Sequence, residues 1–372
     1  MKTAVICVLV IGAWLVPVQA HAQLGILSVC DYDPPESRIR DLMLQGWFSW
    51  YDGASAGAGD RILSARLVVD YEQLFSSAAL GHNVDGHAQL RRTNEAWTAE
   101  LNASGSVRST LTDALFAVGA LGLDASLDGS IELDVTGGVG AGRFRDATPL
   151  AQAITIQNAL LDLGQLLAPV GSGVLIELAQ ILGEVGPTDD EKMIRFAERL
   201  LATELLADEQ LGVLGLLAME ETLRSPYQTR LCGRDAQARI GVSARLLPEA
   251  SFVATGIAAV RFAAVPDPVS QIELAAQAKL RLFRPSELGV DADLSYTRSL
   301  PGRWMAQSNY HLSIDRGWTD PAVVTISHLL SGSLTTQVLG AVGLSLAVEA
   351  GYSSGDDELS VSASVHLEAS LF

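Results

Sequence analysis

The feature of this sequence that most constrains its fold is a strict alternation of apolar and polar residues over residues 358–371. Odd positions from Leu359 to Leu371 are apolar, and even positions from Glu358 to Ser370 are polar or charged. A β-strand points successive side chains to opposite faces, so this period of two predicts a strand with one apolar and one polar face. The stretch exceeds the roughly five or six residues usual in soluble sheets and is long enough to cross a bilayer at a tilt.

The same alternation recurs through most of the chain, in segments that are interrupted by short polar connections. It is found at residues 63–71, 97–103, 121–125, 131–135, 238–244, 252–262, 272–282, 288–296, 304–314 and 342–350. We count about six strands before residue 147 and about eight after residue 230, which predicts a mainly β fold, an antiparallel transmembrane β-barrel of about 14 strands (range about 12–16). Residues 76–85 and 105–113 lack the pattern, and we interpret them as long connections.

Residues 148–224 have a helical period instead and predict about four short amphipathic helices. Thr148 precedes a proline and is predicted as an N-cap, residues 188–191 form a capping box, and Asp208 could cap the fourth helix. We therefore predict a helical subdomain at residues 147–230, inserted between the barrel halves 61–146 and 231–372. Residues 23–60 form an N-terminal segment with a possible first strand. If both barrel termini lie in the periplasm, six preceding strands place the insert on that side.

The N-terminus predicts export. Residues 1–22 combine Lys2, an apolar run at residues 4–18 and small residues at Ala20 and Ala22, as in a cleaved secretory signal peptide. Cleavage leaves Cys30 and Cys232 in an oxidising compartment. They could form a disulfide or remain as thiols, because the sequence does not show whether their Cα atoms come close enough.

Charge and composition exclude several functions. A formal net charge of −18 is unfavourable for nucleic-acid binding. The histidines show no metal-ligand spacing, so we expect neither a metal nor a cofactor. The glycine-rich residues 137–142 lack the lysine of a phosphate-binding loop and are interpreted as small residues on a tightly packed strand. His311 and Ser313 resemble the His-x-Ser pair of outer-membrane phospholipases, but Ile314 and Asp315 depart from that pattern. We expect a lumen histidine and no enzyme.

The polar faces of the strands supply the candidate functional residues. A water-filled barrel needs polar inward side chains, and a basic strip facing an acidic one would set a field across a pore. The candidates for lining such a pore are Arg239, Arg245, Arg261, Lys279, Arg281, Glu132, Asp134, Glu273, Asp291 and Asp293. The alternative is that these side chains pair across strands and fill the lumen.

The signal peptide, the amphipathic strands and a last strand that closes on Phe372 together resemble bacterial outer-membrane β-barrels as a class, without matching a named family. One departure is that Phe372 falls on the polar face of that strand. The resemblance implies insertion among outer-membrane lipids and a porin-like channel for small hydrophilic solutes, with the helical insert as a plug or periplasmic cap. The alternative is a structural or docking barrel with a filled lumen, whose insert (residues 147–230) binds a periplasmic protein. The oligomeric state is not indicated.

Overall fold

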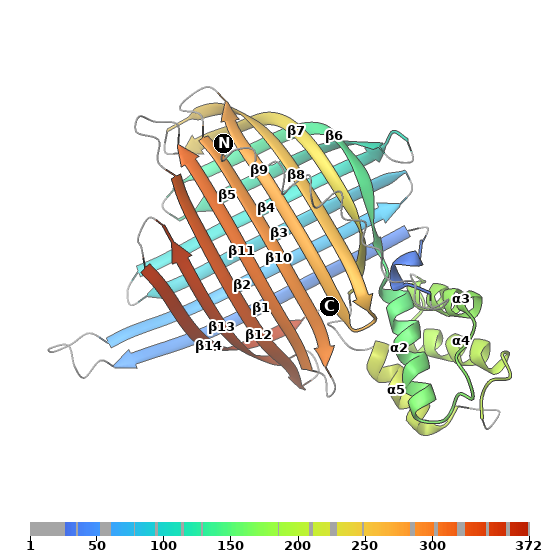
Figure 1. Ribbon diagram of the computed structural model, residues 1–372. Helices are drawn as coiled ribbons and strands as arrows, with labels where there is room; N and C mark the ends of the chain where they lie inside the picture. Colours follow the sequence, from blue (N-terminus) through green and yellow to red (C-terminus); the bar gives the residue numbers. More distant parts are fainter. Residues whose placement is uncertain are drawn as a thin grey trace.

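The computed structural model describes residues 27–370, apart from short gaps at 35, 53–60, 78, 94–95, 113–114, 128, 185, 208–210, 224–228, 248, 283–286, 301–303, 318–323, 340–341 and 355–357. The predicted signal peptide and Phe372 lie outside the described residues. Fourteen long strands dominate the fold (Figure 1). The strands are β1 (Glu36–Asp52), β2 (Arg61–Ser77), β3 (Leu80–Thr93), β4 (Ala96–Thr110), β5 (Leu115–Ser126), β6 (Ile131–Asp146), β7 (Leu231–Leu247), β8 (Ser251–Asp267), β9 (Ser270–Leu282), β10 (Glu287–Leu300), β11 (Trp304–Gly317), β12 (Val324–Leu339), β13 (Val342–Ser353) and β14 (Glu358–Ser370).

The strands form one antiparallel sheet in which each strand pairs with its neighbours in the chain. The sheet closes on itself where β1 pairs with β14, with Met43 opposite Ser370. Six strands precede the helices and eight follow them, in agreement with the count from the sequence. The predicted long connections at residues 76–85 and 105–113 are wrong, because β2 and β3 are joined by only two residues and β4 continues to Thr110, four residues before β5. The alternation is hidden there because His82 and Gly86 occupy the row of β3 that elsewhere carries apolar residues.

The insert consists of α2 (Thr148–Asp162), α3 (Ser172–Gly183), α4 (Asp189–Leu201) and α5 (Val213–Leu223). Its core is apolar and includes Leu150, Ile156, Leu160, Leu178, Phe196, Leu200 and Met219. Figure 1 shows the four helices as a bundle outside the barrel, at the end where β6 finishes and β7 begins. Strand parity puts the start of β1 and the end of β14 at this same end, which we call the helical end. Among the described residues, no helix is both long and apolar enough to span a membrane.

The N-terminal residues of the helices can be compared with the N-caps predicted from the sequence. The capping box at α4 is confirmed, since the amide of Glu191 donates to Thr188 Oγ1 at 3.3 Å and the amide of Thr188 donates to Glu191 Oε2 at 2.8 Å. The prediction for Thr148 is wrong: Ala147 is the N-cap of α2, and Thr148 is the first helical residue. The Thr148 hydroxyl instead accepts a hydrogen bond of 2.8 Å from the amide of Arg230, so it joins the two ends of the insert. Asp208 lies outside the described residues.

The insert is fixed to the barrel through the segment that precedes β1. A short 3-10 helix, η1 (Val29–Asp31), carries Cys30, which forms a disulfide with Cys232 at the start of β7. The two Cα atoms are 5.3 Å apart. Val29 and Cys232 pack in one buried cluster with Ala151 of α2. The N-terminal segment therefore ties the helices and β7 together.

Arg230 makes the second link, immediately before β7. Its side chain is almost fully buried, and its guanidinium donates to the carbonyls of Pro268 at 3.2 Å and Val269 at 3.0 Å and to Ser299 Oγ at 3.0 Å. Burial lowers the pKa of Arg230, and the nearby carboxylate of Asp267 opposes this. Because a buried guanidinium needs acceptors for its N–H groups, these carbonyls fix the exit of the insert against the β8–β9 turn.

Two glycines in the glycine-rich part of β6 leave no room for a side chain. A Cβ atom at Gly138 would lie 2.0 Å from the carbonyl oxygen of Ala238, and one at Gly140 would lie 2.3 Å from the ring of Phe116. The structure thus agrees with the interpretation of these glycines as residues of a closely packed strand. Gly140 in particular leaves room for the buried ring of Phe116.

Candidate functional site

The two faces of the barrel wall differ in chemistry. Large apolar side chains on the outer face are strongly exposed; Ile240 and Phe252, for example, are 75% and 72% exposed. A soluble monomer rarely leaves so much apolar surface in water, whereas a band of this kind is typical of barrels that contact lipid. The inward positions alternate with these residues and are mainly polar or small.

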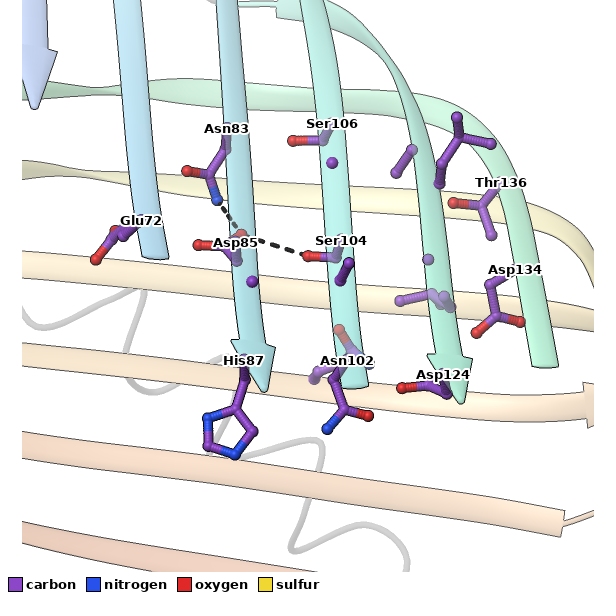
Figure 2. Close-up of a pocket in the computed structure, with 18 of the residues that line it drawn as sticks. Glu72, Asn83, Asp85, His87, Asn102, Ser104, Ser106, Asp124, Asp134 and Thr136 are labelled. Carbon is purple, nitrogen blue, oxygen red and sulfur yellow. Dashed lines mark hydrogen bonds between the residues drawn. The ribbon is translucent and has the colours of Figure 1, made fainter. Parts of the chain in front are cut away.

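The barrel lumen contains a cavity of about 600 Å³, which is the candidate functional site. Polar and charged side chains supply most of its lining: Asp70, Glu72, Asn83, Asp85, His87, Asn102, Ser104, Ser106, Arg108, Asp124, Asp134, Thr136, Gln237, Arg239, Arg261, Gln277 and Lys279. Figure 2 shows the side chains from β2–β6 directed into this space. Asp85 accepts hydrogen bonds from Asn83 at 2.6 Å and from Ser104 at 3.4 Å, and both bonds are drawn in the figure.

Basic side chains form the wall that β7–β9 contribute. Lys279 donates to Asp134 at 3.0 Å, and this contact links β9 to β6 across the lumen side of β7 and β8, which lie between them in the sheet. The hydrogen bond of Arg239 to a described residue is long, 3.5 Å from its Nη1 to the hydroxyl of Thr136. The Arg261 guanidinium lies 5.1 Å from the centre of the Phe144 ring. Among the described residues, no carboxylate oxygen lies within 4.0 Å of a guanidinium nitrogen of Arg239 or Arg261.

Four of the ten candidates from the sequence line this cavity, namely Arg239, Arg261, Lys279 and Asp134. The others also occupy inward rows of their strands but lie elsewhere in the lumen. Glu132 is 4.0 Å from Arg245 and 3.6 Å from Arg281, and Arg281 is 3.0 Å from Glu287. For these residues the alternative, pairing across strands, describes what the structure shows.

The last three candidates lie along β9 and β10. Glu273 accepts a hydrogen bond from the side chain of Gln271, and Asp293 lies 2.6 Å from His311 Nδ1. Asp291 is in the same row as Asp293, opposite Ser313. None of the three lines the cavity. In the part of the chain that the structure describes, no three His, Cys, Asp or Glu side chains group as metal ligands would.

The sequence analysis missed the acidic side of the cavity. Asp70, Glu72 and Asp124 lie on polar faces that the alternation had already marked, so the pattern could have identified them. Asp85 and Arg108 were missed because they lie in the segments interpreted as connections. The sequence did not show which strands would lie opposite the basic wall, so it did not bring these carboxylates into one cavity.

The helical end of the lumen is narrowed by buried side chains. Ile39, Leu74, Phe144, Leu231 and Ala263 form an apolar cluster between facing walls. Some Cα atoms of β6 lie within 8 Å of Cα atoms of β1 and β2, although β6 pairs with neither of these strands in the sheet.

Two arginines that line the cavity lie against buried aromatic rings. Arg108 lies 5.0 Å from the centre of the buried Phe116 ring, and its Nη1 is 3.2 Å from the fully buried Asp235. Arg261 lies in the same way over Phe144, which belongs to the apolar cluster. The cavity thus has a floor at the helical end, made of arginines stacked on buried aromatic rings.

A closed antiparallel barrel with an apolar exterior and a polar, hollow interior is the architecture of outer-membrane β-barrels as a class. Solved structures of similar shape belong to that class. The outer membrane channel DcaP of Acinetobacter baumannii is 8% identical, over 90% of this chain and 96% of that one, with a TM-score of 0.36. A bacterial polysaccharide outer membrane secretin is 6% identical, over 89% and 97%, with a TM-score of 0.34. A loop-deletion mutant of OmpT from Vibrio cholerae is 8% identical, over 91% and 100%, with a TM-score of 0.32.

Similarity at this level transfers neither a solute nor a mechanism to the present chain. No protein-family model matches the sequence, and no curated protein matches it either.

Proposed function

We propose that the protein is exported by its N-terminal signal, inserts in the bacterial outer membrane, and provides a porin-like path for small hydrophilic solutes rather than catalysing a reaction. The helical insert acts as a cap on the periplasmic end. The main support is the cavity of about 600 Å³ inside a barrel whose outer face is apolar. Its volume is within the range of sites that hold small molecules, roughly 300–1,000 Å³.

The position of the helices supports a cap rather than a plug. The bundle lies outside the barrel at the helical end, as Figure 1 shows, and its core is separate from the lumen. The floor at the same end narrows the path, so we expect a low conductance. We also expect movement of the apolar cluster to limit the flux.

The test is single-channel recording in planar bilayers with the full-length mature protein. We expect discrete conductance steps, and Phe144→Ala should enlarge them because it removes a ring from the floor. Phe252→Ala is the matched control, since that ring lies on the outer face and its loss should leave the step size unchanged. A correctly folded barrel that gives no steps, with the Phe144 variant equally silent, would refute the proposal.

A second candidate function is a docking barrel whose insert binds a periplasmic protein. The observation that favours it is the apolar surface of α5, where Val213, Leu214 and Leu217 are 73%, 61% and 53% exposed. Cross-linking of the full-length protein in cells should capture one specific periplasmic partner. Leu214→Ser together with Leu217→Ser should abolish that capture. Equal recovery of proteins by the variant and the wild type would count against docking.

A further inference from the structure

We propose that the lumen cavity binds small zwitterionic solutes, whose anionic group faces Arg239 and Arg261 while the cationic group faces Asp85 and Asp124. This inference rests on the proposed function, because it names the class of solute that would use the same lumen. All four residues line the one cavity, two from the basic wall and two from strands of the acidic wall.

The basic side of the cavity carries positive charge that the described part of the protein does not neutralise by direct pairing. The close contacts given above are a hydroxyl for Arg239 and an aromatic ring for Arg261, and carboxylates act on the two arginines only from beyond 4.0 Å among the described residues. In the part of the chain that the structure describes, no acceptor lies within hydrogen-bond distance of the buried Nε of Arg239. A guanidinium withdrawn from water favours an anion that accepts its N–H groups, and carboxylates fit its planar fork.

On the acidic side of the cavity, Asp85 and Asp124 lack a close cationic partner among the described residues. Asp85 accepts hydrogen bonds from neutral donors, Asn83 and Ser104, and Asp124 stands directly opposite Glu132 across the β5–β6 pair. Among the residues that the structure describes, no Lys, Arg or His nitrogen lies within 4.0 Å of the carboxylate of Asp85 or Asp124. Glu132 has Arg245 and Arg281 nearby, whereas Asp124 has no such counter-charge, so a bound cation next to Asp124 would supply it and would reduce the repulsion between the two carboxylates.

A solute with charge of one sign would satisfy only one side of the cavity. An anion near Arg261 would also meet the field of Asp85, which interacts electrostatically with that arginine. A cation near Asp124 would be repelled by Lys279, which is paired with the neighbouring Asp134. A molecule that carries both charges gains at both sides, and the low polarisability of the surrounding barrel strengthens both contacts relative to water. Uncharged polyols would gain only hydrogen bonds.

The experiment measures binding by isothermal titration calorimetry with the full-length protein in detergent micelles, so that it does not depend on conduction. The probes have the same chain length and differ in charge: γ-aminobutyrate, γ-hydroxybutyrate and aminobutanol. We expect γ-aminobutyrate to bind at least about fivefold more tightly than either singly charged analogue, a difference of about 1 kcal/mol.

Charge-removing variants assign the contacts. Arg239→Gln and Arg261→Gln should each weaken γ-aminobutyrate binding about fivefold or more, as should Asp85→Asn and Asp124→Asn. Arg239→Lys should restore part of the loss, and it serves as the second variant if the glutamine form does not fold. Arg245→Gln is the matched control, because Arg245 is an inward arginine of the same strand that does not line the cavity, and its affinity should stay within about twofold of the wild type.

The two proposals fail separately. A barrel that conducts ions but binds the three probes equally keeps the porin-like function and overturns the zwitterion site. A barrel that is silent in bilayers but binds γ-aminobutyrate selectively keeps the site and overturns the channel. Selective binding that survives all four charge-removing substitutions would overturn the assignment of the residues.

Discussion

Opening the disulfide is the perturbation whose effect on stability can be worked out most directly. Cys30 and Cys232 are 202 positions apart, so the bond closes a loop that contains β1–β6 and the whole helical insert. A disulfide that closes a loop of this length reduces the conformational entropy of the unfolded chain, and the chain-entropy model converts this into about 5 kcal/mol of folding stability. Reduction should therefore lower the free energy of unfolding by up to about 5 kcal/mol. At a urea slope of roughly 3 kcal/mol per molar, this lowers the midpoint by up to about 1.7 M.

The assay compares urea unfolding of the oxidised protein, the reduced protein and the Cys30→Ser, Cys232→Ser double variant, all in the same detergent. Tryptophan fluorescence follows the barrel, and circular dichroism at a helical wavelength follows the insert. The calculation assumes that the N-terminal segment stays docked until the barrel unfolds, as the buried cluster around Val29 and Ala151 suggests. An unchanged midpoint for the barrel, with earlier loss of the helical signal after reduction, would refute that assumption.

Three further predictions concern the junction and the outer face. Burial and, second, the charge of Asp146 raise the pKa of Tyr32 from 10.0 to about 12. The folded protein therefore favours the neutral phenol of Tyr32. The contribution of this group to the free energy of unfolding is complete below pH 10 and is lost as the pH rises to about 12. In Tyr32→Phe, the urea midpoint should no longer fall in this pH range. Arg230→Met should lower the free energy of unfolding by about 3 kcal/mol because it leaves buried carbonyls without donors, whereas Arg199→Met, at a partly exposed arginine, should change it by under about 1 kcal/mol. Ile240→Arg should cost about 2–4 kcal/mol and lower the yield of folding into lipid vesicles, while Ile240→Leu should not. Equal yields would show that this face does not contact lipid.

Local backbone geometry explains how much of the fold could be predicted. A strand exposes alternate side chains to opposite faces whatever its neighbours are, so the period of two identified most strands and which residues of each point inward. The helical period and the capping box at Thr188 are likewise local, and they located the insert. The pattern failed where a polar residue such as His82 stood in an outward row, because hydropathy alone then no longer marks the strand.

The candidate site depended on contacts that no single segment specifies. The alternation could indicate that Lys279 and Asp134 face the lumen, but only barrel curvature brings β9 across two strands to β6. The same closure brings Cys30 to Cys232 and β6 close to β1, which creates the floor of the cavity. The sequence by itself determined which face of each strand is polar, because that follows from side-chain periodicity. Strand register and barrel closure, which are properties of the whole sheet, decided which polar groups meet.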